Sequence, residues 1–219
     1  MPPEEFSKGD ILVINYGLGN IGSLVNALTF LGFDYQVIEN RQDFCAAADI
    51  AGCIVPGVGA FDHGMKQLIE RKLDMLIKDL VQSQVQVLGI CLGMQMLVDE
   101  SEESARKCQG LGLIPGYVSK LNKSNGKVPH MGWTRTFAER PKSREKQKAG
   151  IEIDADFYYV HSYSVVPNQP YHTIASFNHG NERRVAAVQS GNILGVQFHP
   201  EKSQQAGLQL FLEYFGNPQ

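Results

Sequence analysis

The stretch VLGICLGMQ at residues 87–95 decides how this chain is expected to fold. The residues before Cys91 are apolar, as in a buried strand, and those after it have the spacing of an amphipathic helix. Gly89 and Gly93 flank the cysteine with the spacing of a nucleophile elbow, in which small neighbours let the chain turn sharply and expose a reactive side chain. We therefore expect a strand, a tight turn that carries a thiol, and a helix.

The position of Cys91 suits a nucleophile for acyl transfer. Unpaired backbone N–H groups in the first turn of a helix carry partial positive charge and favour the thiolate form. The N–H of Leu92 is expected to point at the carbonyl group that the thiolate attacks. The alternative is a buried structural cysteine, because free cysteine is among the most buried residue types. A partner base elsewhere in the chain decides between the two.

A histidine and a carboxylate two residues apart supply a candidate base. His199 and Glu201 lie in the run GVQFHPEKS at residues 195–203. Side chains two residues apart in extended chain share a face, so Glu201 can accept a hydrogen bond from one imidazole nitrogen and leave the other for the thiol. Taken alone, a His-Pro-Glu tripeptide more often marks a surface turn. Found together with Cys91, it is a candidate Cys-His-Glu triad.

A third segment, PGVG at residues 56–59, follows a strand-like run and leads into a helical pattern. Such a loop can present backbone N–H groups to an anion. The alternative is a tight turn that needs glycine for its positive φ.

Apolar strand-like runs alternate with helical patterns through the first half of the chain. The strand-like runs are 11–15, 35–39, 53–55 and 85–90, and the helical patterns are 20–31, 60–80 and 92–99. This alternation predicts a parallel sheet covered by helices, with the functional site beyond the carboxyl ends of the strands. From residue 110 to 196 short runs rich in valine, tyrosine and glycine turns indicate antiparallel additions, and a last helix is predicted over residues 204–215.

Length and composition set further bounds. The chain has 219 residues, 43% of them hydrophobic, so we expect a tail over residues 1–9 and a single domain over residues 10–219. A net charge of −3 gives no general attraction to nucleic acid or to an acidic membrane. The four cysteines show neither a C-x-x-C pair nor zinc-ligand spacing, so we expect reduced thiols, no metal, no cofactor and a cytoplasmic location. No run approaches transmembrane length or has the order of a signal peptide.

Five motifs resemble known protein families. Three of them, PGVG at 56–59, GICLGMQ at 89–95 and FHPEKS at 198–203, resemble the class I (triad) glutamine amidotransferases. Two more, NYGLGN at 15–20 and PHMGW at 129–133, resemble the glutaminase-subunit family of imidazole glycerol phosphate synthase. The similarity runs from about Ile11 to Phe215, nearly the whole chain.

The resemblance implies a fold and a reaction. The implied fold is α/β, an open, mostly parallel, flavodoxin-like sheet with helices on both faces and antiparallel β additions in the C-terminal half. The implied reaction is hydrolysis of L-glutamine to L-glutamate and ammonia through a thioester. By their match to the family's motifs, Cys91, His199 and Glu201 would be catalytic; Val58, Gly59 and Leu92 would form the oxyanion hole; Gln95 and Tyr163 would bind the substrate. An aromatic residue at position 163 is also consistent with core packing.

The resemblance also implies a partner. The family's glutaminase subunit supplies ammonia to a (β/α)₈ cyclase subunit, which forms imidazole glycerol phosphate and AICAR in L-histidine biosynthesis, in a heterodimer. The residues that match the family's interface are Asn20, Met131, Trp133, Tyr158 and Lys202. Trp133 could equally be a buried anchor, and Lys202 a solvated charge.

Other functions remain open at this point. Thr134 stands where the histidine-pathway subunit commonly has asparagine, which leaves room for a paralogue that supplies ammonia for surface-polysaccharide sugar biosynthesis. Two other classes are a Cys-His-Glu peptidase or γ-glutamyl hydrolase, and a non-catalytic binding module. The charged segment at residues 135–149 is interpreted as a solvated loop, with a contact to an anionic partner as the alternative.

Overall fold

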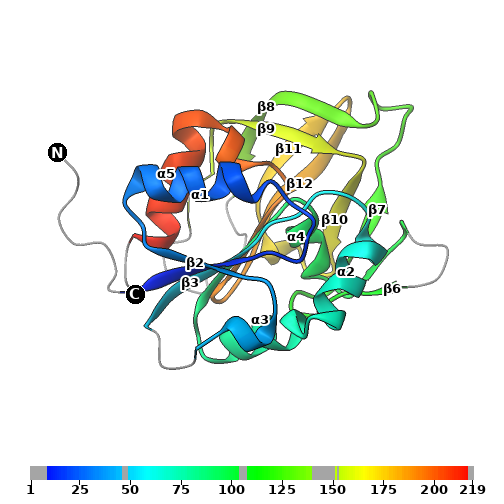
Figure 1. Ribbon diagram of the computed structural model, residues 1–219. Coiled ribbons are helices and arrows are strands. Elements are labelled where there is room, and N and C mark those ends of the chain that lie inside the picture. The colour runs from blue at the N-terminus through cyan, green and yellow to red at the C-terminus, as the bar shows by residue number, and fades with distance from the viewer. Residues whose placement is uncertain (1–8, 46–48, 104–107, 140–150, 152, 217–219) are drawn as a thin grey trace.

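Parallel strands separated by helices form the centre of the molecule, which we describe from a computed structural model (Figure 1). The structure describes residues 9–45, 49–103, 108–139, 151 and 153–216. The helices are α1 (Ile21–Leu31), α2 (Phe61–Glu70), α3 (Leu73–Gln82), α4 (Leu92–Met96) and α5 (Gln204–Phe215). The strands are β1 (Asp10–Ile14), β2 (Tyr35–Ile38), β3 (Ile50–Val55), β4 (Gln86–Ile90), β5 (Glu100–Ser101), β6 (Cys108–Gln109), β7 (Gly116–Lys120), β8 (His130–Ala138), β9 (Asp156–His161), β10 (Tyr163–Pro167), β11 (Thr173–His179), β12 (Glu182–Ser190) and β13 (Ile193–Val196).

The main sheet combines a parallel half with an antiparallel half. Within the described residues it has nine strands in the order β2-β1-β3-β4-β13-β12-β11-β8-β9. The strands from β2 to β13 run parallel to their neighbours, whereas those from β13 to β9 run antiparallel. A smaller sheet has the order β10-β7-β5-β6. The predicted parallel sheet and the antiparallel additions are confirmed.

One strand within the segment expected to be antiparallel belongs to the parallel half. β13 pairs in parallel with β4, with Val196 opposite Ile90. The sequence pattern does not reveal this because the direction of a short apolar strand depends on the partner beside which it inserts. The consequence for the site is direct, since the carboxyl ends of β4 and β13 lie side by side.

Alternate residues of the parallel strands pack into two separate hydrophobic cores, one on each face of the sheet. Ile11 and Val13 of β1 pack on the side of α1 and α5, whereas Leu12 and Ile14 pack on the side of α2, α3 and α4. Figure 1 shows α1 and α5 together over one face of the sheet. This period of two is the expected pattern for a sheet covered on both faces. The predicted helices on both faces are confirmed.

Two of the predicted helices have different bounds in the structure. The pattern over residues 60–80 predicted one helix, but the chain breaks it at Lys72, whose φ of 57° is left-handed, and forms α2 and α3. The helix predicted over residues 92–99 ends at Met96, and the turn at residues 97–99 connects it to β5. The helices predicted over residues 20–31 and 204–215 are confirmed as α1 and α5.

Within the described part of the chain, no helix is both long and apolar enough to cross a membrane. The expected tail over residues 1–9 lies almost wholly outside the described residues, and β1 begins at Asp10. Most of the charged segment at 135–149 is likewise not described, but its first residue, Arg135, lies in β8 and pairs with Asp154 at 2.8 Å.

Candidate active site

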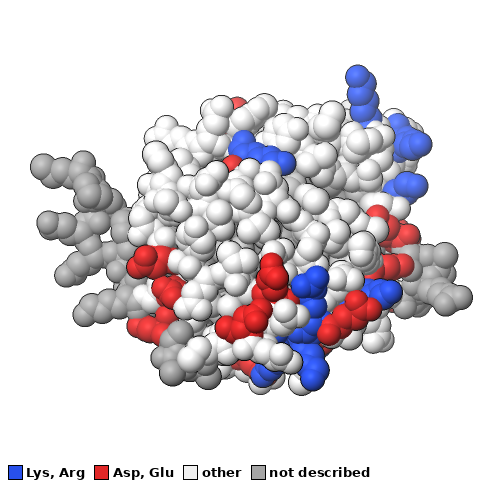
Figure 2. All heavy atoms as spheres, in the orientation of Figure 1, with Lys and Arg blue, Asp and Glu red and all other residues white. Residues whose placement is uncertain are grey.

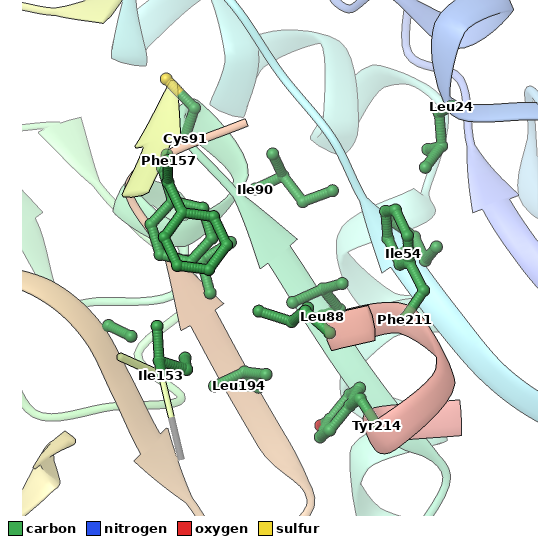
Figure 3. Close-up of a cluster of buried hydrophobic side chains, with 14 of the residues drawn as sticks. Leu24, Ile54, Leu88, Ile90, Cys91, Ile153, Phe157, Leu194, Phe211 and Tyr214 are labelled. Atoms are coloured by element: carbon green, nitrogen blue, oxygen red, sulfur yellow. The ribbon is translucent and has the colours of Figure 1, made fainter. Parts of the chain in front are cut away.

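The predicted elbow is present at Cys91. This residue follows β4, precedes α4 and has φ 54° and ψ −107°, a conformation that L-residues rarely adopt. The turn is tight: a Cβ on Gly93 would lie 1.7 Å from the carbonyl oxygen of Val55. Figure 3 shows Cys91 at the edge of the hydrophobic cluster that includes Ile90, with its sulfur pointing away from the other labelled side chains. The glycines flanking Cys91 therefore allow the turn that directs the thiol out of the core.

His199 and Glu201 lie at the same edge of the sheet, beyond the end of β13. The Nδ1–H of His199 donates to Oε1 of Glu201 at 2.8 Å. Their side chains are only 2% and 6% exposed, so this pair is shielded from water. Because Nδ1 carries the proton shared with the carboxylate, Nε2 is the nitrogen left to act on the thiol. The carboxyl ends of β4 and β13 thus bring Cys91, His199 and Glu201 together.

The environment of His199 favours its protonated form. Burial by itself lowers the pKa of this imidazole, but the Cys91 thiol and the Glu201 carboxylate outweigh burial and raise the pKa to about 10. Nε2 is buried and has no hydrogen-bond partner that meets normal distance and angle limits among the described residues. Cys91 is therefore the electrostatic partner of this nitrogen. The arrangement suits a thiolate–imidazolium pair.

Helix α4 contributes less to the thiolate than the sequence suggested. It has five residues, so its dipole comes from little more than one turn. The positive charge that faces the sulfur is supplied by His199, not by the helix.

Ser203 fixes the backbone of the triad. Its hydroxyl donates to the carbonyl oxygen of His199 at 2.6 Å and accepts from the N–H of Tyr158 at 3.0 Å. The N–H of His199 in turn donates to the carbonyl of Tyr158 at 2.9 Å. Sequence reasoning assigned Ser203 no role, although it lies in the quoted FHPEKS run.

The predicted oxyanion-hole residues lie beside the thiol, but the N–H of Leu92 already donates to another backbone group. The N–H of Leu92 donates to the carbonyl oxygen of Gly57 at 3.3 Å. Gly59 has φ 109°, which a side chain would disfavour, and Val58 is partly exposed above the thiol pocket. In this conformation the Leu92 N–H points at the loop rather than at an empty oxyanion position.

A pocket of about 330 Å³ opens beside the thiol. Its lining comprises Val58, Gly59, Cys91, Leu92, Gln95, Glu103, Pro129, Val160, His161, Ser162 and Tyr163. All the residues predicted for the oxyanion hole and the substrate contact are among them. Glu103 was missed by sequence reasoning; it brings a carboxylate into the pocket, and its Oε2 also accepts from the N–H of Phe61 at 2.8 Å.

Gln95 is tied to Tyr163 through the backbone. Its Nε2 donates to the carbonyl oxygen of Tyr163 at 3.0 Å and to Oε1 of Gln197 at 3.2 Å. Its side-chain nitrogen is therefore occupied, and its oxygen is the group left for a ligand. Tyr163 is partly buried: it lines the pocket and also packs against the hydrophobic core on the side of α2, α3 and α4.

Two neutral histidines support this wall of the pocket. His161 donates from Nδ1 to the Tyr163 carbonyl at 2.7 Å, so its Nε2 accepts from Nδ1 of His130 at 3.0 Å. Because Nδ1 of His130 is the donor, its Nε2 accepts a hydrogen bond from the hydroxyl of Thr134 at 2.9 Å. Burial, with smaller effects from neighbouring histidines, lowers the pKa of His130 to about 4 and that of His161 to about 3. Thr134, the departure noted in the sequence, therefore has a defined hydrogen-bonding role.

The predicted interface residues gather around this edge. Met131 and Trp133 are 67% and 50% exposed on β8, so Trp133 is not a buried anchor. Trp133 packs edge-on against Tyr158, its partner across β8 and β9, with ring centroids 6.2 Å apart. Lys202 is exposed beside the triad, and Asn20 caps α1 by accepting from the N–H of Ser23.

No group of three or more His, Cys, Asp or Glu side chains in the described residues is placed to hold a metal ion.

Comparisons with known proteins agree with this geometry. Residues 12–216 match the family model for glutamine amidotransferase class-I. The chain is 41% identical to the imidazole glycerol phosphate synthase subunit HisH of Moorella thermoacetica, over 94% of this chain and 93% of that protein. It is 43% identical to the protein named subunit HisH 2 of Vibrio vulnificus, over 91% of this chain and 90% of that protein. A solved structure described as a glutamine amidotransferase superposes with a TM-score of 0.69 at 20% identity, over 95% of this chain and 100% of that one. The chain therefore belongs to the class-I glutamine amidotransferase family.

Proposed function

We propose that this chain hydrolyses L-glutamine to L-glutamate and ammonia, with Cys91 as nucleophile, His199 as acid and base, and Glu201 as the residue that orients the imidazole. The observation that carries the proposal is the meeting of a strained cysteine elbow with a buried His-Glu pair at one pocket. A structural cysteine would need neither the backbone strain nor the charged neighbours.

In the first half-reaction the sulfur of Cys91 attacks the side-chain carbonyl carbon of glutamine. The tetrahedral intermediate collapses when its C–N bond breaks, and Nε2–H of His199 gives its proton to the departing nitrogen, which leaves as ammonia. A thioester on Cys91 and a neutral His199 remain.

In the second half-reaction the loss of the thiolate charge changes the imidazole. Cys91 raises the pKa of His199 in the free enzyme, and a thioester sulfur carries no charge to do so. The neutral Nε2 can therefore accept a proton from water as the water attacks the thioester. Cleavage of the C–S bond releases glutamate and restores the thiolate–imidazolium pair.

The pocket offers complementary groups for the rest of glutamine. We place the α-ammonium group near the Glu103 carboxylate, because an opposite charge inside a partly closed pocket is its natural partner. The oxygen of Gln95, whose nitrogen is engaged by the Tyr163 carbonyl, accepts an N–H of the substrate.

The oxyanion hole we assign to Leu92 and the Val58–Gly59 turn requires a local movement. The Leu92 N–H can donate to an oxyanion only after the Gly57 carbonyl turns away from it. We therefore expect low activity from the chain alone and higher activity when a partner reshapes this loop.

We propose that the partner is a (β/α)₈ cyclase subunit that receives the ammonia, forming a cytoplasmic heterodimer that acts in L-histidine biosynthesis. The relatives named imidazole glycerol phosphate synthase subunit support this pairing. So do the exposed Met131 and Trp133, with Asn20, Tyr158 and Lys202 at the same edge. We assign residues 10–219 to one glutamine amidotransferase domain.

The test is glutamate release from glutamine by the purified chain, alone and with a histidine-pathway cyclase subunit and its nucleotide ligand. We expect the cyclase to stimulate release, and Cys91→Ala to abolish it under both conditions. Full activity in Cys91→Ala would remove the mechanism. Glutamate release that this cyclase does not stimulate would favour the paralogous role in surface-polysaccharide sugar biosynthesis.

A further inference from the structure

A buried amide links the nucleophile to the residue that faces the substrate. Gln197 follows β13, two residues before His199, and is 0% exposed. Its Nε2 donates to the sulfur of Cys91 at 3.7 Å, and its Oε1 accepts from Nε2 of Gln95 at 3.2 Å. None of the roles assigned above uses this side chain.

The orientation of both amides is fixed by one backbone carbonyl. The Tyr163 oxygen can only accept, so the Gln95 atom 3.0 Å from it must be the nitrogen. That nitrogen also faces Gln197, so the Gln197 atom it meets must be the oxygen. The remaining amide atom, which faces Cys91, is therefore the donor. The backbone N–H of Gln197 bonds to the carbonyl of Ala186 at 2.8 Å, which holds the residue in place.

The donor matters most when Cys91 is charged. As a thiol, Cys91 donates to the Val160 carbonyl at 3.8 Å, but a thiolate has no proton for that oxygen. The Gln197 N–H then remains as a neutral donor whose hydrogen bond strengthens with the charge on sulfur. When the C–S bond of the thioester breaks and the negative charge returns to the sulfur, this donor is aimed at it.

We propose that Gln197 stabilises and aims the Cys91 thiolate, and that its coupling to Gln95 ties the nucleophile to the substrate-facing wall of the pocket. The inference rests on the proposed glutaminase function, which gives the thiolate its role. It adds a fourth side chain to the candidate triad.

The experiment measures alkylation of Cys91 by iodoacetamide as a function of pH, with peptide mass spectrometry to separate it from Cys45, Cys53 and Cys108. Gln197→Leu removes the donor, and Gln197→Glu keeps the shape but places an acceptor against the sulfur. We expect the alkylation midpoint to rise by about one pH unit in Gln197→Leu, because a hydrogen bond to a charged group is worth roughly a tenfold change in population. Gln197→Glu should shift it at least as far.

The matched control is Thr136→Val. Thr136 is as deeply buried as Gln197, and its hydroxyl bonds to that of Tyr159 at 2.6 Å and not to the thiol. This variant should lower the thermal midpoint without moving the alkylation midpoint. All variants are assayed well below their thermal midpoints.

Alkylation midpoints equal to wild type in both Gln197 variants would overturn the proposal. If Gln197→Leu does not fold, Gln197→Glu alone decides it. Failure of the glutaminase function would look different: wild type would release no glutamate with any partner, whereas the alkylation profiles would still report on Gln197.

Discussion

Cys91 combines a strained backbone with a sulfur that several neighbours hold. Positive φ in a residue with a side chain costs on the order of 1–3 kcal/mol. The N–H of Cys91 is nevertheless satisfied by the carbonyl of Val196 at 2.8 Å, and its side chain is 5% exposed. This hydrogen bond to the end of β13 and the burial of the side chain hold the residue in its strained conformation.

The pKa of His199 predicts the pH range of thioester formation. Its value near 10 lies above the ordinary imidazole value, so the acid that protonates ammonia is present below that pH and lost as pH rises through it. Rapid-quench measurement of the first turnover should show a constant rate of ammonia release from pH 7 to 9 and a fall near pH 10. Glu201→Gln removes one of the groups that raise the pKa, so its fall should come at lower pH. A wild-type rate that already declines above pH 6.5 would contradict this account.

At the scale of elements, the site is made by the carboxyl ends of neighbouring parallel strands. β4 leads to Cys91, β13 leads to His199, and β3 leads to the PGVG loop. Because β13 pairs with β4 in register, residues far apart in sequence emerge next to each other. The short helix α4 begins at once, since Gly93 lets it approach the end of β3.

This close approach predicts the effect of a single methyl group. In Gly93→Ala the new Cβ would lie 1.7 Å from the Val55 carbonyl oxygen, which is backbone and cannot move alone. We expect at least about 3 kcal/mol loss in the free energy of unfolding, at the upper end for overpacking. The control is Gly22→Ala in α1, where the nearest heavy atom is 4.0 Å away. Urea titration should show that variant unchanged or stabilised by up to about 1 kcal/mol. Equal stability of both variants would show that the elbow is not tight.

At the scale of the whole molecule, exposed aromatic and sulfur side chains occur on several elements, among them Met75 of α3 and Tyr117 of β7. Met131 and Trp133 are exposed on β8, at the site's edge, whereas Phe30 is 77% exposed near the far end of α1. In the view of Figure 2, Lys and Arg side chains lie beside Asp and Glu along the lower rim, and the middle of the face carries few charges. At the site's edge, Met131 and Trp133 offer a partner apolar contacts, and the exposed Lys202 adds a positive charge.

Trp133→Ala tests the proposed docking edge. As an exposed aromatic anchor, Trp133 should contribute about 2 kcal/mol to binding, so its loss should weaken affinity for the cyclase roughly 30-fold. Titration calorimetry measures this affinity, and Phe30→Ala provides a control that should bind normally. Cys91 alkylation should be unchanged in both variants. Lost thiol reactivity in Trp133→Ala would instead assign the tryptophan to the fold of the site.

Features with a local physical cause could be predicted from the sequence. Helix α1 follows from its apolar spacing, the Asn20 cap and the left-handed Gly32 that ends it. The elbow follows from two glycines around Cys91. The His199–Glu201 contact was predicted correctly but for the wrong backbone, because Pro200–Lys202 forms a 3-10 helix and not the extended chain from which the contact was expected. Two local outcomes are unexpected: a left-handed Lys72 divides what the pattern marks as one helix, and α4 ends at Met96.

The sequence by itself determined the parallel core, the elbow, the His-Glu pair and the family. The tertiary structure decided what depends on neighbours distant in the chain. It placed β13 parallel to β4, brought Glu103 into the pocket, aimed the Gln197 amide at the thiol and engaged the Leu92 N–H with Gly57. Periodicity and capping act within a few residues and can be recognised along the chain. Burial and hydrogen-bond partnership are fixed only when the strands assemble, because each requires a group from another strand or loop.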